Sequence, residues 1–378
     1  MKKTLIAAGV LGCFAGAATA ANVELYGLID TGLSYVHTDA DVAGVKSTDS
    51  FTMENASEFG SRWGLRGSED LGDGYKVSFT LESGFESDTG ALDTKQGGRL
   101  FGREASITLS TPFGTLSAGR LPLFGSVLGA NGLFRAIDPI FANYTVGLGS
   151  GYATASSWTR VDNALSYRTP TFAGVTGYAM YSFQNDSVKG TGTEGKSSTD
   201  RYGSLALRYQ NGAFEGVLVA DATFWGNQAY EDADDGYTVT LGGNYTFDNG
   251  LKVIAFGQYF DKMFLNANAR AGVVKNGLTA YLGSTGYGQV DGWGAGVGVN
   301  YPVLGGVAKF AVNYRDMSNQ TDVDFTRFTV AAAYDYALSK RTSLYGLAGF
   351  SQEKIEKSGA DSVSPNGYQV VLGLLHRF

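Results

Sequence analysis

Residue types that commonly carry catalysis are scarce in this chain. His37 and His376 are its only histidines, and neither has plausible catalytic partners nearby in the sequence. The single cysteine, Cys13, lies in an N-terminal apolar run. A hydrolase or a metal enzyme needs a base or a set of ligands gathered in a cleft. The sequence therefore predicts no enzyme, no metal site and no cofactor.

Arginines offer a different chemistry, the attraction of anions. In the stretch from Arg62 to Arg66, the two basic side chains alternate with Trp63 and Leu65. Side chains two residues apart in a β-strand share a face, so a strand here has one charged face and one apolar face. The charged face needs water, and the apolar face needs a core or lipid.

The elements that would position these arginines are alternating segments of about 8 to 12 residues. The connections between them are alternately tight and long, which is typical of transmembrane β-barrels. At ~10 residues per strand the wall uses about 160 residues and leaves the rest for connections, which fits one domain. We predict an all-β fold, a sixteen-stranded antiparallel barrel with strands near residues 23–35, 59–67, 75–85, 101–110, 115–120, 163–169, 175–183, 201–209, 213–224, 237–247, 251–260, 292–302, 307–316, 325–338, 342–352 and 366–378.

The N-terminus carries an export signal. Lys2 and Lys3 precede an apolar run and a small-residue cleavage site, a pattern typical of a signal peptide over residues 1–20. The barrel domain would then be residues 21–378. Cys13 loosely resembles a lipoprotein processing site, but the apolar region before it would be only about 6 residues long, which is short for a signal.

Composition favours a strand-rich membrane protein. Glycine makes up 54 of the 378 residues, about double the ~7% of average proteins, and charged residues are 17% of the chain. A basic side chain that faces lipid at the midplane costs ~2 to 4 kcal/mol, so the charged faces point inward, and sixteen strands leave an aqueous channel there. The mature chain has 27 basic and 36 acidic residues, a net charge of −9, which argues against nucleic-acid binding.

Several stretches together resemble the trimeric general porins of proteobacterial outer membranes. The resemblance implies a homotrimer, a channel for small hydrophilic solutes and ions, and a long third loop, residues 121–158, that folds into the lumen as a constriction. It also implies contact with outer-membrane lipid and lipopolysaccharide, and a terminal Phe378 that the barrel assembly machinery reads. The matching stretches are residues 23–30, 61–74, 101–105 and 113–120, with Phe378.

The same resemblance implies which residues line the pore. Three arginines match the family's constriction positions, three more lie on neighbouring strands, and one inward acid stands opposite them. The third loop contains a single acid, Asp138, which could line the pore or form hydrogen bonds within its loop. Because the family usually places more acids on this loop, we expect a weak preference for anions. The predicted constriction and lumen residues are Arg62, Arg66, Glu82, Arg103, Arg120, Asp138, Arg160 and Arg168.

Two other patterns have competing interpretations. The glycines at positions 292, 294, 296 and 298 lack the spacing of a phosphate-binding loop and share one strand face, which indicates close packing or a thin wall. The acidic stretch 232–235 could hold a divalent cation, although a solvated loop explains it as well. Aromatic residues near strand ends are expected in the girdles at the two membrane interfaces, namely Tyr26, Tyr245, Tyr259, Tyr301, Tyr314 and Phe378.

Three functions are compatible with such a barrel: a passive diffusion pore, a substrate-selective channel, and an adhesin or structural barrel. A sugar channel should line its path with aromatic residues, and an adhesin should carry binding motifs in its outer loops. Arginines around a long glycine-rich loop favour diffusion through a charged constriction. We therefore expect an outer-membrane porin with a weak anion preference.

Overall fold

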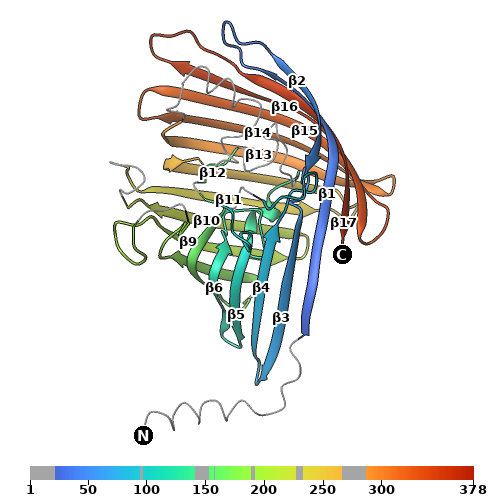
Figure 1. Ribbon diagram of the computed structural model, residues 1–378, viewed down its shortest axis with the longest axis vertical. Coiled ribbons are helices and arrows are strands. Elements are labelled where there is room, and N and C mark those ends of the chain that lie inside the picture. The colour runs from blue at the N-terminus through green and yellow to red at the C-terminus, as the bar shows by residue number, and fades with distance from the viewer. Residues whose placement is uncertain are drawn as a thin grey trace.

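The wall of the protein is one antiparallel sheet that closes on itself. The computed structural model describes residues 22–93, 97–140, 153–156, 158–188, 192–226, 233–265 and 287–378, so the predicted signal peptide lies outside the described residues. From β3 onward each strand pairs with the next, and β1 pairs with β17, which lies beside it in Figure 1. The strands are β1 (Asn22–Asp39), β2 (Thr48–Asn55), β3 (Arg62–Gly72), β4 (Tyr75–Gly84), β5 (Glu104–Thr111), β6 (Gly114–Pro122), β7 (Arg160–Arg168), β8 (Val175–Ser182), β9 (Arg201–Asn211), β10 (Phe214–Phe224), β11 (Gly236–Thr246), β12 (Lys252–Phe264), β13 (Gln289–Val303), β14 (Gly306–Asn319), β15 (Val323–Ala337), β16 (Thr342–Lys357) and β17 (Asn366–Arg377).

β2 and β3 occupy a single position in this wall. Residues 31–38 of β1 pair with β2, whereas residues 22–28 of β1 pair with β3. The seventeen strands therefore form sixteen wall positions, which confirms the predicted sixteen-stranded barrel. The sequence prediction missed β2, because Thr48–Asn55 has only Phe51 and Met53 as alternating apolar residues.

A buried aspartate holds the break between β2 and β3. The Asp30 carboxylate accepts hydrogen bonds from the backbone N–H groups of Glu58 and Phe59, at 2.9 and 2.6 Å, and from the Tyr345 hydroxyl. Ala56, at the start of the break, has a left-handed backbone with φ of 61°. Asp30 thus satisfies backbone donors that the interrupted sheet would otherwise leave unpaired.

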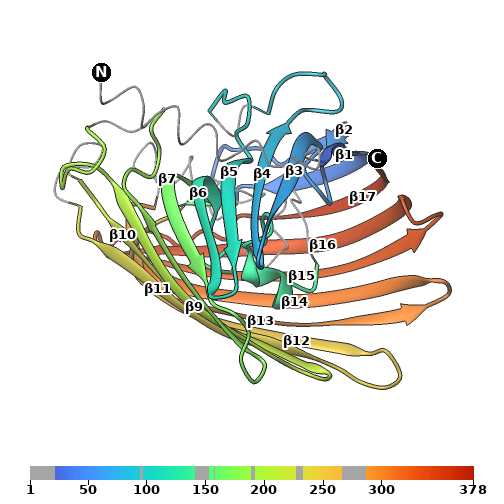
Figure 2. The same ribbon diagram turned by 90° about the horizontal axis from the view of Figure 1, so that it is seen from below.

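The barrel wall is uneven in height. Strands β5 to β8 have 8 or 9 residues each, whereas β13 to β16 have 14 to 16. In Figure 2 the long strands β13 to β16 extend across one side of the barrel. Among the described residues, no helix is long and apolar enough to cross a membrane.

The long connection after β6 folds against the inner wall. Its described part begins with Leu123, after the end of β6, and includes the short 3-10 helix η2 (Leu133–Ala136). This part lies within the space that the wall encloses (Figures 1 and 2). The Ala136 carbonyl accepts a 2.7 Å hydrogen bond from the Asn244 side chain of β11. Its apolar side chains form one cluster with wall residues of β6, β10 and β12: Leu123, Phe124, Leu133, Phe134 and Ile137 pack with Leu121, Val217, Val219, Ile254 and Phe256. The predicted insertion is confirmed for residues 123–140. Residues 121 and 122, which were predicted to begin the loop, belong to β6, and residues 141–152 and 157 lie outside the described residues.

Glycines on the inner face of β13 allow this close approach. A Cβ atom on Gly298 would lie 2.5 Å from Cγ of Pro139, and one on Gly294 would lie 1.7 Å from the Ala153 carbonyl oxygen. Both contacts are with the inserted connection. The interpretation of the glycine stripe as a close-packing surface is therefore confirmed at these two positions.

A cluster of charged side chains on β14 to β16 is buried. Glu353 pairs with Arg315 at 2.8 Å and with Arg327 at 3.4 Å. All three side chains are at most 1% exposed. The Tyr287 hydroxyl also donates to Glu353. Glu353 offsets one of the two positive charges, and the three side chains are shielded from water, so they offer little to a passing ion.

Candidate pore constriction

Neighbouring wall positions bring the predicted arginines together. Arg62 begins β3, Arg103 immediately precedes β5, and Arg160 begins β7. The backbone N–H of Arg103 donates to the Glu82 carbonyl on β4, which aligns these residues across the wall. Since inward side chains at one height share a face, a single side of the barrel carries the basic groups.

Glu82 was expected opposite the arginines, but it lies among them on the same side of the barrel. Its carboxylate accepts a 2.7 Å hydrogen bond from Nε of Arg103 and lies 3.8 Å from Nη1 of Arg62. The Tyr26 hydroxyl donates to its other oxygen at 3.0 Å. One carboxylate therefore orients two guanidinium groups, and the local charge of these three ionisable groups stays positive.

Tyr26 corrects one sequence prediction. It was expected in an aromatic girdle, but its side chain shares the inward face with Glu82, and the Arg66 guanidinium lies 4.8 Å from its ring centroid. Tyr245, Tyr259, Tyr301 and Phe378 are outwardly exposed, as girdle residues should be. The prediction for Tyr26 failed because its hydroxyl donates to a carboxylate 56 residues away in the sequence, and no local pattern shows such a contact.

Arg160 and Arg120 are held more tightly than free lumen side chains. Nε of Arg160 donates to the Arg103 carbonyl at 2.6 Å, and Arg160 is only 5% exposed. Nε of Arg120 donates to the Gly102 carbonyl, and its Nη1 pairs with Asp162 at 2.5 Å. Both arginines therefore brace the backbone just before β5, which positions Arg103.

Asp162 is an acidic residue beside the predicted arginines that the sequence prediction missed. It receives ion pairs from Arg120 and from Arg99, the latter at 2.7 Å, and two hydrogen bonds from Ser187. It therefore offsets much of the Arg120 charge. Asp162 lies two residues after Arg160 in β7, so strand alternation places both side chains on the inward face. This spacing is visible in the sequence and could have predicted the position of Asp162.

Arg66 and Arg168 lie away from this group. Arg66 forms a bidentate pair with Glu24 at 2.9 and 3.0 Å and is exposed. Arg168 is exposed beside the tight turn after β7 and reaches Thr115 at 3.4 Å. Both belong to the same wall as predicted, but the structure does not bring them to Glu82.

The inserted connection adds a basic residue that was not predicted. Arg135 of η2 lies close enough to Glu82 and Arg103 to interact with both. Its pKa is lowered, mainly by burial and further by Arg103, while Glu82 opposes the shift. The side chain is anchored by a hydrogen bond from Nε to the Val127 carbonyl at 2.9 Å. We name Arg62, Arg103, Arg135, Arg160 and Glu82 the arginine cluster.

Asp138 lies in the inserted connection, two residues after the end of η2. It is 7% exposed, and its neighbours Ile137 and Pro139 pack against Gly242 and Gly298 of the far wall. Its role as a pore-lining acid stays a prediction.

The acidic stretch after β10 is engaged in protein contacts. Asp234 pairs with Nζ of Lys262 at 2.7 Å, and Asp235 accepts the backbone N–H of Trp225, while Asp232 lies outside the described residues. In the described ranges, no group of three or more potential ligands could hold a metal ion. The contacts favour a structural role for Asp234 and Asp235.

A closed barrel with an inserted connection and inward arginines defines a membrane channel. The sequence profile of the Gram-negative porin family matches residues 6–355, and the chain belongs to this family. Family and fold thus point to a channel of the outer membrane rather than to an enzyme.

Named relatives agree with this assignment. The chain is 34% identical over 399 residues to an outer membrane porin protein of Bordetella pertussis, with 100% of both chains covered. It is 31% identical over 366 residues to outer membrane porin protein 32 of Delftia acidovorans, covering 94% of this chain and 90% of the relative. A solved structure, an anion-selective porin from Comamonas acidovorans, is similar with a TM-score of 0.67 and 27% identity, covering 95% of this chain and 100% of that one.

Proposed function

We propose that this porin passes small hydrophilic solutes and ions by passive diffusion, with a weak preference for anions. The observation that carries the proposal is the arginine cluster, in which four guanidinium groups surround Glu82. Glu104, on the neighbouring strand β5, adds a second carboxylate nearby. A basic surface with low-dielectric walls raises the local concentration of anions.

Local charge outweighs the acidic character of the whole chain. At physiological ionic strength the screening length is about 8 Å, so distant loop carboxylates have little effect on an ion beside Arg103. Arg315 and Arg327 are buried around Glu353, which offsets one of their two charges, and they lie on another part of the wall. Similarity to a porin described as anion-selective supports the same sign of selectivity.

Single-channel recording in a planar bilayer tests the proposal. With a salt gradient across the membrane, the reversal potential should indicate moderately higher permeability for chloride than for potassium. The preference should weaken at high salt because screening increases. A strong preference for potassium would contradict the proposed role of the arginine cluster.

The assembly of the channel is also a proposal. We infer a homotrimer in the outer membrane, exported by the signal peptide at residues 1–20 and inserted by the barrel assembly machinery, with lipopolysaccharide around the outer half of the barrel. Resemblance to trimeric general porins supports these inferences. Size-exclusion chromatography with light scattering on protein from outer membranes should give three chains per particle.

A further inference from the structure

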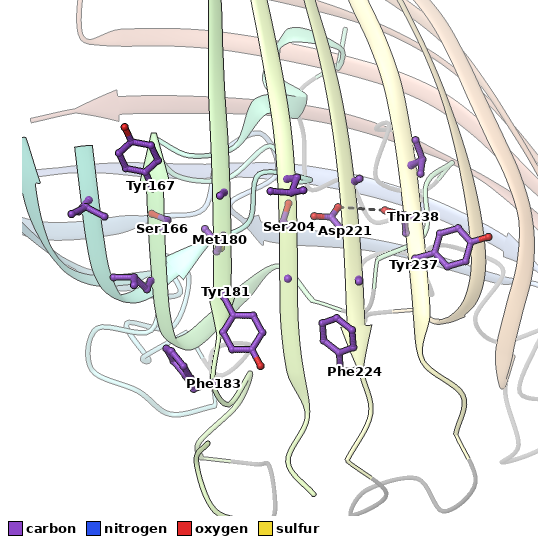
Figure 3. A pocket seen from close by; sticks show the side chains of 18 residues that line it. Ser166, Tyr167, Met180, Tyr181, Phe183, Ser204, Asp221, Phe224, Tyr237 and Thr238 are labelled. Atoms are coloured by element: carbon purple, nitrogen blue, oxygen red, sulfur yellow. Dashed lines mark hydrogen bonds between the residues drawn. The ribbon is translucent and has the colours of Figure 1, made fainter. Parts of the chain in front are cut away.

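The outer face of β7 to β11 contains a hollow of about 600 Å³. Small outward residues form its floor, because Ala179, Gly203, Ala220 and Ala222 stand where neighbouring strands carry large side chains. Tyr181, Phe224 and Tyr237 lie at one end of the hollow (Figure 3). Outwardly exposed Leu205 and Val239 show that this face is the one that meets lipid.

The hollow is narrow at its aromatic end. A Cβ atom on Gly203 would lie 3.5 Å from the Phe224 ring and 3.9 Å from the Tyr181 ring, so the two rings flank the glycine. Phe183 packs edge-on against Tyr181 with ring centroids 5.1 Å apart. A slot of this width suits a single hydrocarbon chain better than the flat face of another barrel.

A basic side chain stands at the rim of the slot. Arg201, the first residue of β9, pairs in register with Phe224 and has the same outward parity as Gly203 and Leu205. Its guanidinium carbon lies 5.6 Å from the Phe224 ring centroid. In the described part of the chain, its Nε is buried and has no hydrogen-bond partner. Phosphate binding would use the guanidinium group of this outward arginine, whose charge and planar set of N–H donors suit a phosphate at the membrane surface.

The position of Arg201 identifies the leaflet. The ends of β8, β9, β10 and β11 at this rim join long connections, whereas their other ends join tight turns. Long connections face the cell exterior in barrels of this kind. The rim therefore lies at the headgroup level of the outer leaflet, where the phosphorylated glycolipid of Gram-negative cells resides.

We propose that the hollow binds one acyl chain of lipopolysaccharide while Arg201 binds a phosphate of its lipid A headgroup. The slot supplies apolar contact along the chain, and Arg201 supplies the matching charge. The proposal rests on placing the barrel in the outer membrane and is independent of ion selectivity.

The test uses the purified, folded protein in micelles and hexa-acylated lipid A with two phosphates, titrated and counted by native mass spectrometry. Arg201→Gln should weaken binding about tenfold, because a charge-assisted contact is lost. Gly203→Leu should abolish binding by filling the slot. Lipid A without phosphates should bind the unmodified protein more weakly than lipid A with two phosphates does. It should bind the unmodified protein and Arg201→Gln with equal affinity.

Two matched controls lie on the same outward surface elsewhere. Lys354 is a basic residue near the outer end of β16, already paired with Glu356 at 2.7 Å, and Gly257 on β12 has open space around its Cβ position. Lys354→Gln and Gly257→Leu should leave lipid A binding unchanged. Channel conductance should be unchanged in all four variants, which separates a failure of this site from a failure of the pore.

Equal binding of lipid A to the unmodified protein, Arg201→Gln and Gly203→Leu would overturn the proposal. So would loss of the oligomer in Gly203→Leu, because the hollow would then be a contact between subunits.

Discussion

At the scale of single residues, selectivity depends on how each arginine is paired. Glu82 contacts Arg103 and Arg62, whereas Asp162 takes up Arg120 together with Arg99. Arginines of the same inward face therefore differ in how much charge they present to an ion. Two substitutions that should shift the reversal potential in opposite directions test this difference between the arginines.

Arg103→Glu should shift the reversal potential toward cations. The substitution changes the local charge by two units, and two charges about 6 Å from an ion in water change its energy by about 1 kcal/mol, a several-fold change in permeability ratio. The shift should be larger at low salt than at high salt. Arg168→Gln is the control, because its site lies about 25 Å further along β7 at ~3.3 Å per residue. An Arg103→Glu pore with unaltered reversal potential would exclude this residue from the selectivity-setting group.

Asp162→Asn should shift the reversal potential toward anions. The amide keeps the shape of the side chain and can still accept hydrogen bonds from Ser187, but it no longer offsets the charges of Arg120 and Arg99. Reversal potentials in a salt gradient measure the change. An unchanged reversal potential would mean that Arg120 and Arg99 do not act on the permeating ion.

At the scale of elements, glycine and one buried aspartate shape the wall. The inner glycines of β13 let the inserted connection approach the backbone, and Asp30 closes the gap between β2 and β3. The glycines make room for irregular backbone inside the barrel, and Asp30 supplies an acceptor for two N–H groups of the break.

Gly298→Ala should disturb the inserted connection. The new Cβ would meet Pro139 at 2.5 Å and the Phe310 carbonyl oxygen at 2.5 Å, and such overpacking typically costs about 1 to 3 kcal/mol. We expect lower single-channel conductance and earlier unfolding in urea. Gly257→Ala, where the Cβ meets no atom within 4 Å, is the control and should change neither quantity. Equal behaviour of the two variants would show that close packing at β13 does not hold the connection.

Asp30→Ala should destabilise the folded barrel. The substitution leaves the N–H groups of Glu58 and Phe59 without their acceptor, and each buried unsatisfied group costs about 1 to 3 kcal/mol. Asp30→Asn keeps one acceptor oxygen and should lose less. The midpoint of urea unfolding, followed by tryptophan fluorescence in micelles, should fall in the order unmodified, Asn, Ala. An unchanged midpoint in the alanine variant would remove Asp30 from the set of stabilising contacts.

At the scale of the whole molecule, the seam between β1 and β17 closes the barrel. Phe378 exchanges two backbone hydrogen bonds with Gly27, at 3.0 and 3.1 Å, and its ring lies over Gly27 on the outward face. The glycine leaves room for the ring, since a Cβ there would lie 2.4 Å from Cζ of Phe378.

Deletion of Phe378 should reduce the amount of assembled porin in the outer membrane. Both seam hydrogen bonds and the proposed recognition signal would be lost together. Heat-modifiable mobility on gels of outer-membrane fractions measures assembly, and Phe378→Tyr, which keeps the aromatic ring and the backbone, should assemble normally. Normal assembly of the truncated chain would contradict the signal role.

The sequence predicted the barrel because strand alternation is a local property. The family resemblance also indicated that Arg62, Arg103 and Arg160 share a face of the lumen. It was wrong about Glu82, which was expected opposite these arginines but contacts Arg62 and Arg103. The sequence did not predict the partner of Tyr26, the proximity of Arg135 to Glu82, or the split between β2 and β3. Each of these depends on residues distant in sequence, or on a connection whose path no alternation pattern determines.

The uneven height of the wall has a consequence for the surrounding membrane. Strands β5 to β8, with 8 or 9 residues, tilted at about 40°, rise only about 20 Å, less than the ~25 Å apolar band of an outer-membrane barrel. Lipids beside these strands must therefore be compressed, at a cost of fractions of a kcal/mol per Å of mismatch. When two such particles bring their low sides together they share one compressed zone. We therefore expect a lateral attraction, mediated by the lipid itself, that favours patches of this protein in the cell envelope.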